Sequence, residues 1–509
     1  MPTLLAVKKV DAGIFPEFKD NISDGRWITS RNVRFGYSQV SKSMVNGAKT
    51  AFPAVAGSPE SIFVVKTATQ EILYFCFNSK IYHVDAATGV ITEIGQLGGV
   101  TTEFGVLAGS ITPRSNWTMV SLGGLQIFCR PGFYPLKNTN LTSIALLNDV
   151  PGAPDCMMVL AGRLVIGSIR SVPLAGGGAP IWATETAMNR VYWSAPYAPE
   201  SWTRDLSAKS GYADLIVNDR NTTRFDRPVE MVQNGEIGYI FTDNGIWVLA
   251  VAEHPRVFDL TFLGHGFKIF GQKTWCISDQ QGSPMYVMGE DDFYMIIDRG
   301  ILRMPLAIYS ECFDQVNRNS RETAFAYYQQ KTREVHFCVP VGTLANTKPT
   351  LDFCYNIDTK SWGILDCDYL ATSLFGRSQN TGIHKGIHVD PADGLAKMFD
   401  VDKDNATPLA STVTAKFGLG YPGSRKILHS IIPRFTSTGT PTINVDIKSR
   451  RSAAHPLVST PQKQFIVGTD RQIKSGARGE EFEITFSESG TVPWHLHEYT
   501  LDYSVEDID

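Results

Sequence analysis

The feature that most constrains the fold of this chain is a short unit of strand, polar turn and strand that ends in an aromatic residue. Segment 190–202 is a full copy, in which Val191 and Trp193 alternate with polar positions as in a half-buried strand. Pro196 and Pro199 then end the strand, because each proline removes a ladder donor and restricts the residue before it. A chain that keeps rebuilding this unit is predicted to be rich in short strands.

The unit recurs along most of the sequence. Segment 353–362 ends at Trp362 in the same way, and segment 243–247 is a third variant. Segment 61–95 contains four strand-like runs joined by hairpin-length turns, which is the size of one propeller blade. Looser copies follow at a spacing of about 35 to 45 residues, which is typical of blade repeats.

These repeats predict an all-β chain with three parts. We expect a β-propeller-like domain of about six or seven blades over residues 55–405. Longer alternating runs after that point predict a C-terminal β-sandwich domain over 406–509. Residues 1–54 hold few strong strand signals and are predicted to form an N-terminal interface segment.

Two tryptophans are predicted to lie in blade cores. Trp193 and Trp362 both end a strand-like run of the repeated unit, and large aromatic side chains dominate the burial of apolar area in cores. The alternative for both is an exposed platform on which a ligand stacks.

Composition excludes several classes of protein. A hydrophobic fraction of 43% with 19% charged residues is a normal balance for a folded chain. The net charge of −4 argues against a basic surface that grips nucleic acid. No apolar run has signal-peptide or transmembrane length. The eight cysteines include no close C-x-x-C pair, which favours free thiols in a reducing compartment.

Motif searches predict no catalytic residue, no cofactor and no metal. Segment 418–423 matches a dinucleotide-binding pattern in letters, but Pro422 and the β-branched run after it argue against the helix that the pattern needs. Segment 266–274 resembles a P-loop with its lysine one place too late. His384 and His388 could pair as ligands only on a helix, which Gly382 and Gly386 argue against. His495 and His497 share a strand face, but no third ligand is marked. Loops far apart in the chain can still build a site on a propeller.

A basic and aromatic strand is predicted within 24–35. Arg26, Arg31 and Arg34 occupy polar positions of this alternating run. Arginine forks bind interface carboxylates as well as phosphates, so these residues are predicted to contact a neighbouring subunit or a partner protein rather than nucleic acid.

Several segments, taken together and in order, carry a family resemblance. Asp24-Gly25, the sequence Arg-Asn-Val-Arg-Phe at 31–35, Lys42 and Asn46-Gly47 form the opening motif, and later matches lie at 191–202, 325–337, 355–362 and 478–503. This order resembles the tail nozzle (tail tubular) proteins of short-tailed bacteriophages. The chain departs from the family pattern at 36–40, which lacks a glycine- and lysine-rich tract, and at 496–499, where a glycine is usual.

The resemblance implies a structural virion protein and no enzyme. It implies a homohexamer that docks to the portal-adaptor complex through the adaptor (head-to-tail connector) protein, with tail fibres or tailspikes as further candidate partners. The ring would form the distal tail tube through which phage DNA is ejected without specific binding or membrane insertion. Such a protein is located in the virion after assembly in the host cytoplasm. A slightly acidic chain suits this role, because a lumen of lysine and arginine would trap phosphates through counterion release.

Two acidic clusters are predicted to lie in turns. Glu290, Asp291 and Asp292 are candidates for the lumen wall, as is the segment 400–404, although solvated turn carboxylates would look the same. The rival hypothesis is a monomeric β-propeller enzyme or carbohydrate-binding protein. That class requires polar and aromatic residues that converge on the central tunnel of the propeller.

Overall fold

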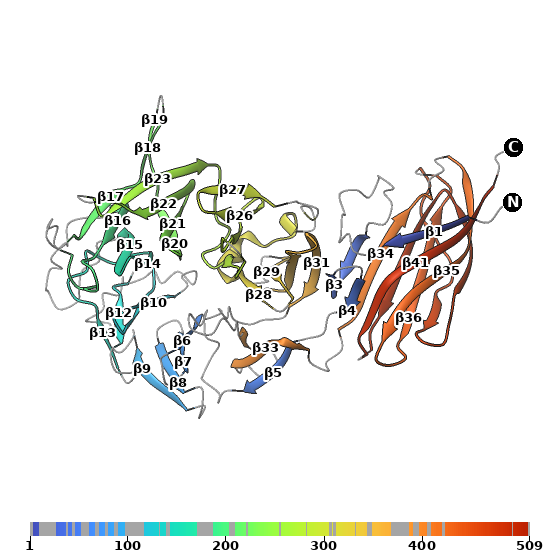
Figure 1. The fold of residues 1–509 in the computed structure, drawn as a ribbon, viewed down its shortest axis with the longest axis horizontal. Helices are drawn as coiled ribbons and strands as arrows, with labels where there is room; N and C mark the ends of the chain where they lie inside the picture. Colours follow the sequence, from blue (N-terminus) through green and yellow to red (C-terminus); the bar gives the residue numbers. More distant parts are fainter. Residues whose placement is uncertain are drawn as a thin grey trace.

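The computed structural model consists of a ring of small antiparallel sheets beside a β-sandwich (Figure 1). The structure describes residues 4–9, 27–36, 39–42, 46–51, 61–66, 71–76, 80–85, 90–96, 117–131, 133–138, 143–169, 187–202, 209–219, 222–253, 256–280, 282–304, 308, 312–330, 332–343, 349–367, 386–389, 396–404, 409–419, 423–452, 454–490 and 492–506.

Seven sheets of the described residues follow one another around the ring as the blades of a propeller. Six of them are four-stranded meanders in chain order. The first two blades are β6(Ser61–Lys66), β7(Glu71–Cys76), β8(Lys80–Asp85) and β9(Ile91–Gln96), and β10(Thr118–Leu122), β11(Leu125–Cys129), β12(Leu136–Asn138) and β13(Ile144–Leu146). The next two are β14(Cys156–Leu160), β15(Arg163–Ile169), β16(Ala187–Trp193) and β17(Gly211–Asp214), and β20(Pro228–Asn234), β21(Ile237–Thr242), β22(Gly245–Val251) and β23(Phe258–His265). The last two of the six are β24(Trp275–Ile277), β25(Met285–Met288), β26(Phe293–Ile297) and β27(Gly300–Arg303), and β28(Phe325–Gln329), β29(Glu334–Val339), β30(Leu351–Asn356) and β31(Ser361–Asp366).

Inner strands of a blade are buried on both faces because each blade is covered by a neighbour on either side, whereas outer strands such as β17 and β27 are partly exposed. Every residue of β15 and of β29 is buried, although each strand contains charged residues. The hairpin between β20 and β21 turns at Asn234–Gly235, where Gly235 has a φ of 63° that a side chain would make costly. The turn chemistry read from the sequence therefore sets the ends of these strands.

The seventh blade is built from both ends of the propeller sequence. β32(Gly386–Val389) pairs with β33(Ala396–Asp404), and β33 pairs with β5(Asn46–Ala51) from near the start of the chain. Asp400 and Asp404 lie in this strand, with a register shift between them, so the prediction of an acidic turn at 400–404 is wrong. The ladder to β5 takes up this segment and closes the ring.

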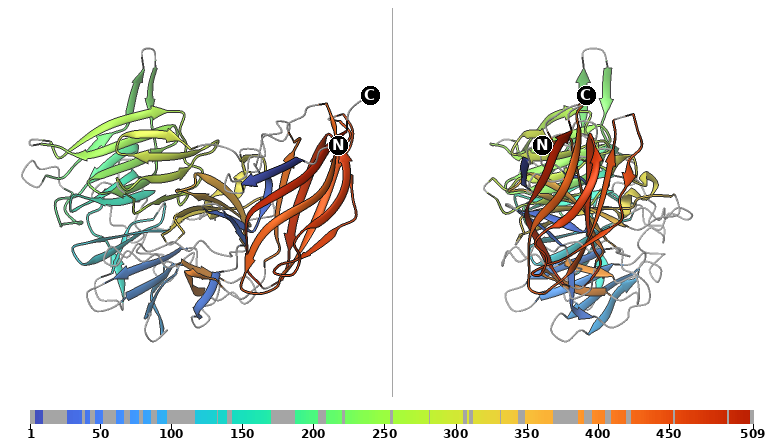
Figure 2. Two further views of the ribbon diagram at one scale, coloured as in Figure 1. Left: turned by 45° about the vertical axis from the view of Figure 1, so that its right-hand side comes forward. Right: turned by 90° about the vertical axis from the view of Figure 1, so that its right-hand side faces the viewer.

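The sandwich consists of two six-stranded sheets. One contains β3(Val33–Gly36), β4(Gln39–Lys42), β41(Trp494–Glu506), β35(Arg425–Ser437) and β39(Ile473–Gly479), with β1(Leu4–Lys9) paired to β41. The other contains β2(Trp27–Arg31), β34(Ser411–Phe417), β40(Glu481–Glu488), β36(Thr442–Arg450) and β37(Val458–Ser459), with β38(Lys463–Ile466) paired to β36. The left view of Figure 2 shows the sandwich beside the ring. Trp27 of one sheet lies 5.8 Å from Tyr499 of the other, ring centroid to ring centroid, within the apolar core.

Residues 1–54 do not form the separate interface segment that the sequence suggested. Four of their strands, β1 to β4, complete the sandwich, and β5 completes the propeller. These strands are short and their partners lie at the far end of the sequence, so no local alternation marks which sheet they join. The sandwich thus contains both ends of the chain, which lie close together in Figure 1.

A hairpin of β18(Ile216–Asp219) and β19(Thr222–Phe225) projects from the ring between two blades (Figure 2). A short 3-10 helix, η2(Arg318–Thr323), precedes β28. Among the described residues no helix is long and apolar enough to cross a membrane. All eight cysteines are free and buried.

The two tryptophans of the repeated unit differ in their burial. Trp362 on β31 is 1% exposed and packs against Phe293 of the preceding blade, with ring centroids 4.6 Å apart. Trp193 on β16 is half-buried and meets Phe258 of the following blade edge to face at 5.4 Å. Both therefore pack between blades, Trp362 completely and Trp193 at the border with solvent.

We expect Trp362→Ala to destabilise the protein by about 3–5 kcal/mol, as large-to-small changes in a core do. Trp193→Ala should cost clearly less, because part of its indole is already in solvent. Urea denaturation of both variants measures the difference. Equal losses in the two variants would contradict the assignment of Trp362 to the deeper core.

Candidate functional site

Residues 31–35 of the opening motif lie at the junction between the propeller and the sandwich, whereas Asp24 and Gly25 lie outside the described residues. Asn32, between β2 and β3, has a φ of 55°, a conformation that asparagine tolerates better than most residues. Its Nδ2 donates to Asp366 Oδ2 at 2.6 Å and to the Ala410 carbonyl at 2.7 Å, and its Oδ1 accepts from the Asp366 backbone N–H at 2.7 Å. One side chain thus ties the sandwich strands to β31 of the propeller.

The two described arginines of the motif bind the same blade. Arg31 forms an ion pair with Asp366, and Arg34 Nε lies 3.7 Å from the Glu334 carboxylate on β29. The backbones also approach closely, because a Cβ on Gly363 would lie 3.1 Å from the Val33 carbonyl oxygen. Arg31 and Arg34 therefore hold two parts of one chain together. Their contact with a subunit or adaptor stays a prediction.

Arg26 lies outside the described residues, so its predicted role cannot be placed on the structure. Lys42, the lysine of the opening motif, is buried in the sandwich and bonds Glu488 and the Gly490 carbonyl. Asn32 and Lys42 are thus buried and Arg34 is mostly buried, whereas the side chain of Arg31 is 43% exposed. All four connect strands from distant parts of the chain.

The turn predicted to face a lumen carries balanced charge. The carboxylate of Glu290 forms ion pairs with Lys268 and Arg321, each at 2.8 Å. Asp292 is 5% exposed and pairs with Arg303 at 2.8 Å, and burial raises the pKa of its carboxyl. Asp291 is exposed and accepts a hydrogen bond from Tyr294. Cations of the same chain therefore offset much of the negative charge that the sequence displays here, and a position on a lumen wall stays a prediction.

A pocket of about 220 Å³ lies where several blades begin their first strands. Its lining includes Asp155, just before β14, and Arg227, just before β20, which form an ion pair. Lys268 and Gln272, from the segment before β24, also line it. The first strands β10 and β14, β14 and β20, and β24 and β28 contact one another, which places first strands at the inner side of the ring. The pocket lies where three such strands begin, and we call it the axial pocket. Ligand pockets for drug-sized molecules occupy about 300–1,000 Å³. The axial pocket is smaller and suits only a compact polar ligand.

A buried lysine spans the axis. Lys273 Nζ bonds Ser61 Oγ, and Lys273 is 5% exposed. Lys273 precedes β24 and Ser61 begins β6, and in the ring these two blades are separated by two blades on one side and three on the other. Their side chains can meet only across the centre. The axis is therefore filled by side chains at this level.

Glu230 on β20 lies in the electrostatic field of this lysine. It is fully buried, and burial raises its pKa to about 8, although the Met231 backbone N–H and the charge of Lys273 oppose the rise. A glutamic acid with this pKa is largely protonated at neutral pH. It is a perturbed carboxyl at the axis that sequence patterns did not single out.

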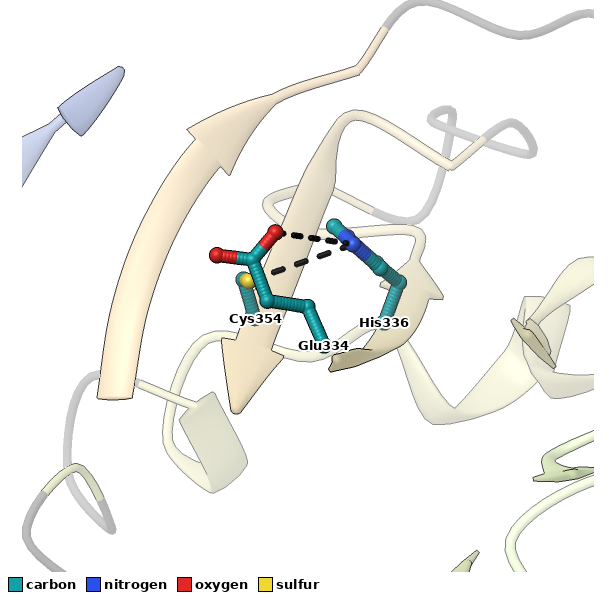
Figure 3. Close-up of side chains that lie close together, drawn as sticks. All are labelled: Glu334, His336 and Cys354. Carbon is teal, nitrogen blue, oxygen red and sulfur yellow. Dashed lines mark hydrogen bonds and ion pairs between the residues drawn. The ribbon is translucent and has the colours of Figure 1, made fainter. Parts of the chain in front are cut away.

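The described residues also bring Glu334, His336 and Cys354 together inside one blade (Figure 3). His336 Nδ1 lies 2.7 Å from Asp352 Oδ2, and His336 Nε2 lies 3.7 Å from Glu334 Oε2 and 4.0 Å from Cys354 Sγ. Tyr327 stacks on the imidazole at 4.4 Å between ring centroids. The side chains of Glu334, His336 and Asp352 are at most 4% exposed.

Opposing effects set the charge states of this cluster. Burial disfavours the charged forms, but Arg34 and His336 lower the pKa of Glu334 to about 2. Asp352 and Cys354 likewise outweigh burial at His336 and raise its pKa. Burial raises the pKa of Cys354 to about 12. The cluster therefore combines a glutamate whose pKa is lowered, a histidine whose pKa is raised and a cysteine whose pKa is raised.

Sequence patterns missed this cluster because its members lie on two paired strands. In the register of β29 and β30, His336 faces Cys354 and Cys338 faces Asp352. Alternation places Glu334, His336 and Cys338 on one face of β29, so the polar set gathers on one side of the blade. The sequence signal was the E-x-H spacing in a strand, but only the strand register supplies the cysteine.

Comparisons with known proteins identify no relative by sequence: no family model and no curated protein matches the chain. Similar solved structures include YCF48 bound to D1 peptide, with 8% identity over 69% of this chain and 95% of that chain and a TM-score of 0.38. The WD40 domain of Pan2 from Neurospora crassa has 8% identity over 70% and 94%, with a TM-score of 0.39. BamB from Moraxella catarrhalis has 9% identity over 74% and 99%, with a TM-score of 0.36. The chain is a β-propeller protein with a β-sandwich domain, as the sequence predicted.

We expect Asn32→Gly to destabilise the protein by about 1–3 kcal/mol, because it removes the side-chain bonds to Asp366 and Ala410 and leaves their groups unpaired. Asn32→Ala should cost about 1–2 kcal/mol more, because alanine is strained at positive φ. Guanidinium unfolding of both variants measures these losses. A glycine variant as stable as the wild type would show that the backbone conformation alone matters at this junction.

Glu230 should make stability depend on pH. Its pKa of about 8 in the folded chain lies above the unfolded value of about 4.3, so its stabilising effect is complete below the unfolded pKa and is lost as pH rises through about 8. We expect Glu230→Gln to lose less stability than the wild type between pH 5 and pH 9, by on the order of a few kcal/mol. Urea unfolding at the two pH values measures this, with Glu236→Gln in the adjacent exposed turn as control. Parallel pH profiles for wild type and Glu230→Gln would contradict the shift.

Proposed function

We propose that the chain is a structural virion protein that forms the hexameric distal tail tube, or nozzle, of a short-tailed bacteriophage. The observation that carries this proposal is the place of the opening motif. Asn32, Arg34 and Lys42, which carry the sequence resemblance, fix the sandwich strands to one another and to the propeller. A motif that braces two domains suits a subunit whose task is to keep its shape in a ring.

The closed propeller axis supports a conduit formed between subunits. Lys273 and Ser61 meet across the axis, so duplex DNA has no path through the centre of a single propeller at that level. A tube for DNA built from this chain must therefore have several copies around a shared lumen. The homohexamer implied by the resemblance meets this requirement.

The proposal includes partners and location. The hexamer docks to the phage adaptor protein, with tail fibres or tailspikes as further candidate partners, and it is assembled in the host cytoplasm and located in the virion. DNA passes through it without specific binding, and the chain is not an enzyme. The net charge of −4 supports passage of DNA without trapping. A slightly acidic protein neutralises few phosphates, so it releases few of the DNA's counterions and gains little binding free energy.

The axial pocket favours a second candidate function. A monomeric propeller that binds or transforms a small ligand would use the site lined by Arg227, Lys268 and Arg321. Its cations pair with Asp155 and Glu290, and a compact anion could compete for them. The volume of about 220 Å³ is too small for an oligosaccharide, which weakens the carbohydrate-binding version of this hypothesis.

We expect the purified chain to have a mass of about six times its 56.2 kDa in native mass spectrometry or light scattering, at a protein concentration near that of assembly. Addition of the cognate adaptor is the second arm, for a ring that forms only on its partner. A species of 56.2 kDa in both arms would contradict the nozzle and favour the monomeric propeller.

A further inference from the structure

We propose that Glu334, His336 and Cys354 bind a Zn²⁺ ion inside the blade formed by β28 to β31, with Asp352 orienting the histidine. This site is independent of the proposed ring, because all four residues belong to one sheet of one chain. Imidazole nitrogen, thiolate sulfur and carboxylate oxygen are the donors that zinc takes in proteins.

The positions of the donor atoms carry the proposal. One donor atom from each of Glu334, His336 and Cys354 lies within 4.8 Å of the other two. Around a tetrahedral zinc ion such atoms stand about 3.3–3.6 Å apart, given the usual bond lengths. Nε2 of His336 is 3.7 Å from the glutamate oxygen and 4.0 Å from the sulfur. Small side-chain rotations bring these atoms to bonding distance and leave one position for a water molecule.

The second observation is a pair of buried carboxylate oxygens without hydrogen bonds among the described residues. Glu334 Oε2 is one of them, and it points toward His336 in Figure 3. Its distances to His336 Nε2 and Arg34 Nε are both 3.7 Å, which is too long for a hydrogen bond. Asp352 Oδ1 is the other. Glu334 Oε2 thus has ion pairs with Arg34 and His336 at long range, and a metal ion would bind the oxygen at closer range.

Asp352 supplies the outer contact that zinc-binding histidines usually have. Its Oδ2 is 2.7 Å from His336 Nδ1, which places the proton on Nδ1 and aims Nε2 at the glutamate and the cysteine. Carboxylate–histidine pairs of this kind fix the tautomer and the ring orientation at zinc sites. Tyr327, stacked on the imidazole, holds the ring plane as well.

The charged side chains around the donor atoms suit a cation. The acidic side chains of Glu334 and Asp352 lie beside His336, and the guanidinium of Arg34 is the cation that faces Glu334. Coordination of Cys354 as a thiolate would add a negative charge that a divalent cation offsets.

The test is metal analysis of the intact purified chain. We expect about one Zn²⁺ per chain by inductively coupled plasma mass spectrometry, as a single three-residue site requires. Cys354→Ser and His336→Gln should each lower zinc affinity by at least about tenfold, in line with the loss of a ligand or of its support. Cys338→Ser is the matched control, because Cys338 is a buried cysteine on the same face of β29 and lies outside the donor set.

Two measurements on the wild type keep the test decisive if a variant does not fold. Cobalt added to chelator-treated chain should produce a thiolate-to-metal charge-transfer band, which reports a cysteine ligand directly. Zinc, and not magnesium, should raise the melting temperature of the same sample, because a ligand of the folded state stabilises it by mass action. A chain that binds neither ion, or binds cobalt without the thiolate band, would overturn the site and leave a metal-free ion network.

Discussion

The structure depends on the ladder between β5 and β33, which closes the propeller with strands from opposite ends of its sequence. Without it, β33 would present an unpaired edge, and the ring would be an open row of sheets. The chain begins in the sandwich, crosses to the ring before β5 and returns after β33. Two covalent crossings, both next to the closing strand, therefore connect the domains. The ladder that closes the ring is therefore adjacent in sequence to both connections to the sandwich.

Side chains at the junction restrict the relative motion of the two domains that two covalent connections alone would allow. Asn32 uses both amide hydrogens and its carbonyl oxygen on groups that belong to or adjoin both domains. Arg34 extends the contact to Glu334, which is also a member of the buried cluster with His336. The state of that cluster is thereby coupled to the junction. An ion bound there would compete with Arg34 for the carboxylate and alter how firmly the sandwich is held.

Local sequence patterns predicted the blades because the turn residues and apolar runs that form each hairpin lie next to one another in the sequence. The turn at 234–235 and the apolar runs beside it require no knowledge of the rest of the chain. Residues 1–54 were misjudged because the partners of β1 and β5, β41 and β33, lie hundreds of positions away and leave no local mark. The donor set around His336 was missed for a related reason, since its cysteine comes from the register of β30. The periodicity of a sequence predicts which face of a strand is buried, but it does not predict which other strand pairs with it.

The distribution of charge limits how a tube of this protein would repel DNA. Glu290 and Asp292 were the natural candidates for a repulsive wall, but Lys268, Arg321 and Arg303 of the same chain sit against them. At physiological salt the field of such a pair fades within about 8 Å, so it neither attracts nor repels a polyanion over any useful distance. The net charge of −4 must then act through acids that lack such partners. In a ring of identical subunits each exposed acid is repeated around the lumen, so even a few unpaired carboxylates on the shared face would form a continuous negative band. Repulsion of DNA by such a tube thus requires a lumen face with more unpaired aspartate and glutamate than lysine and arginine.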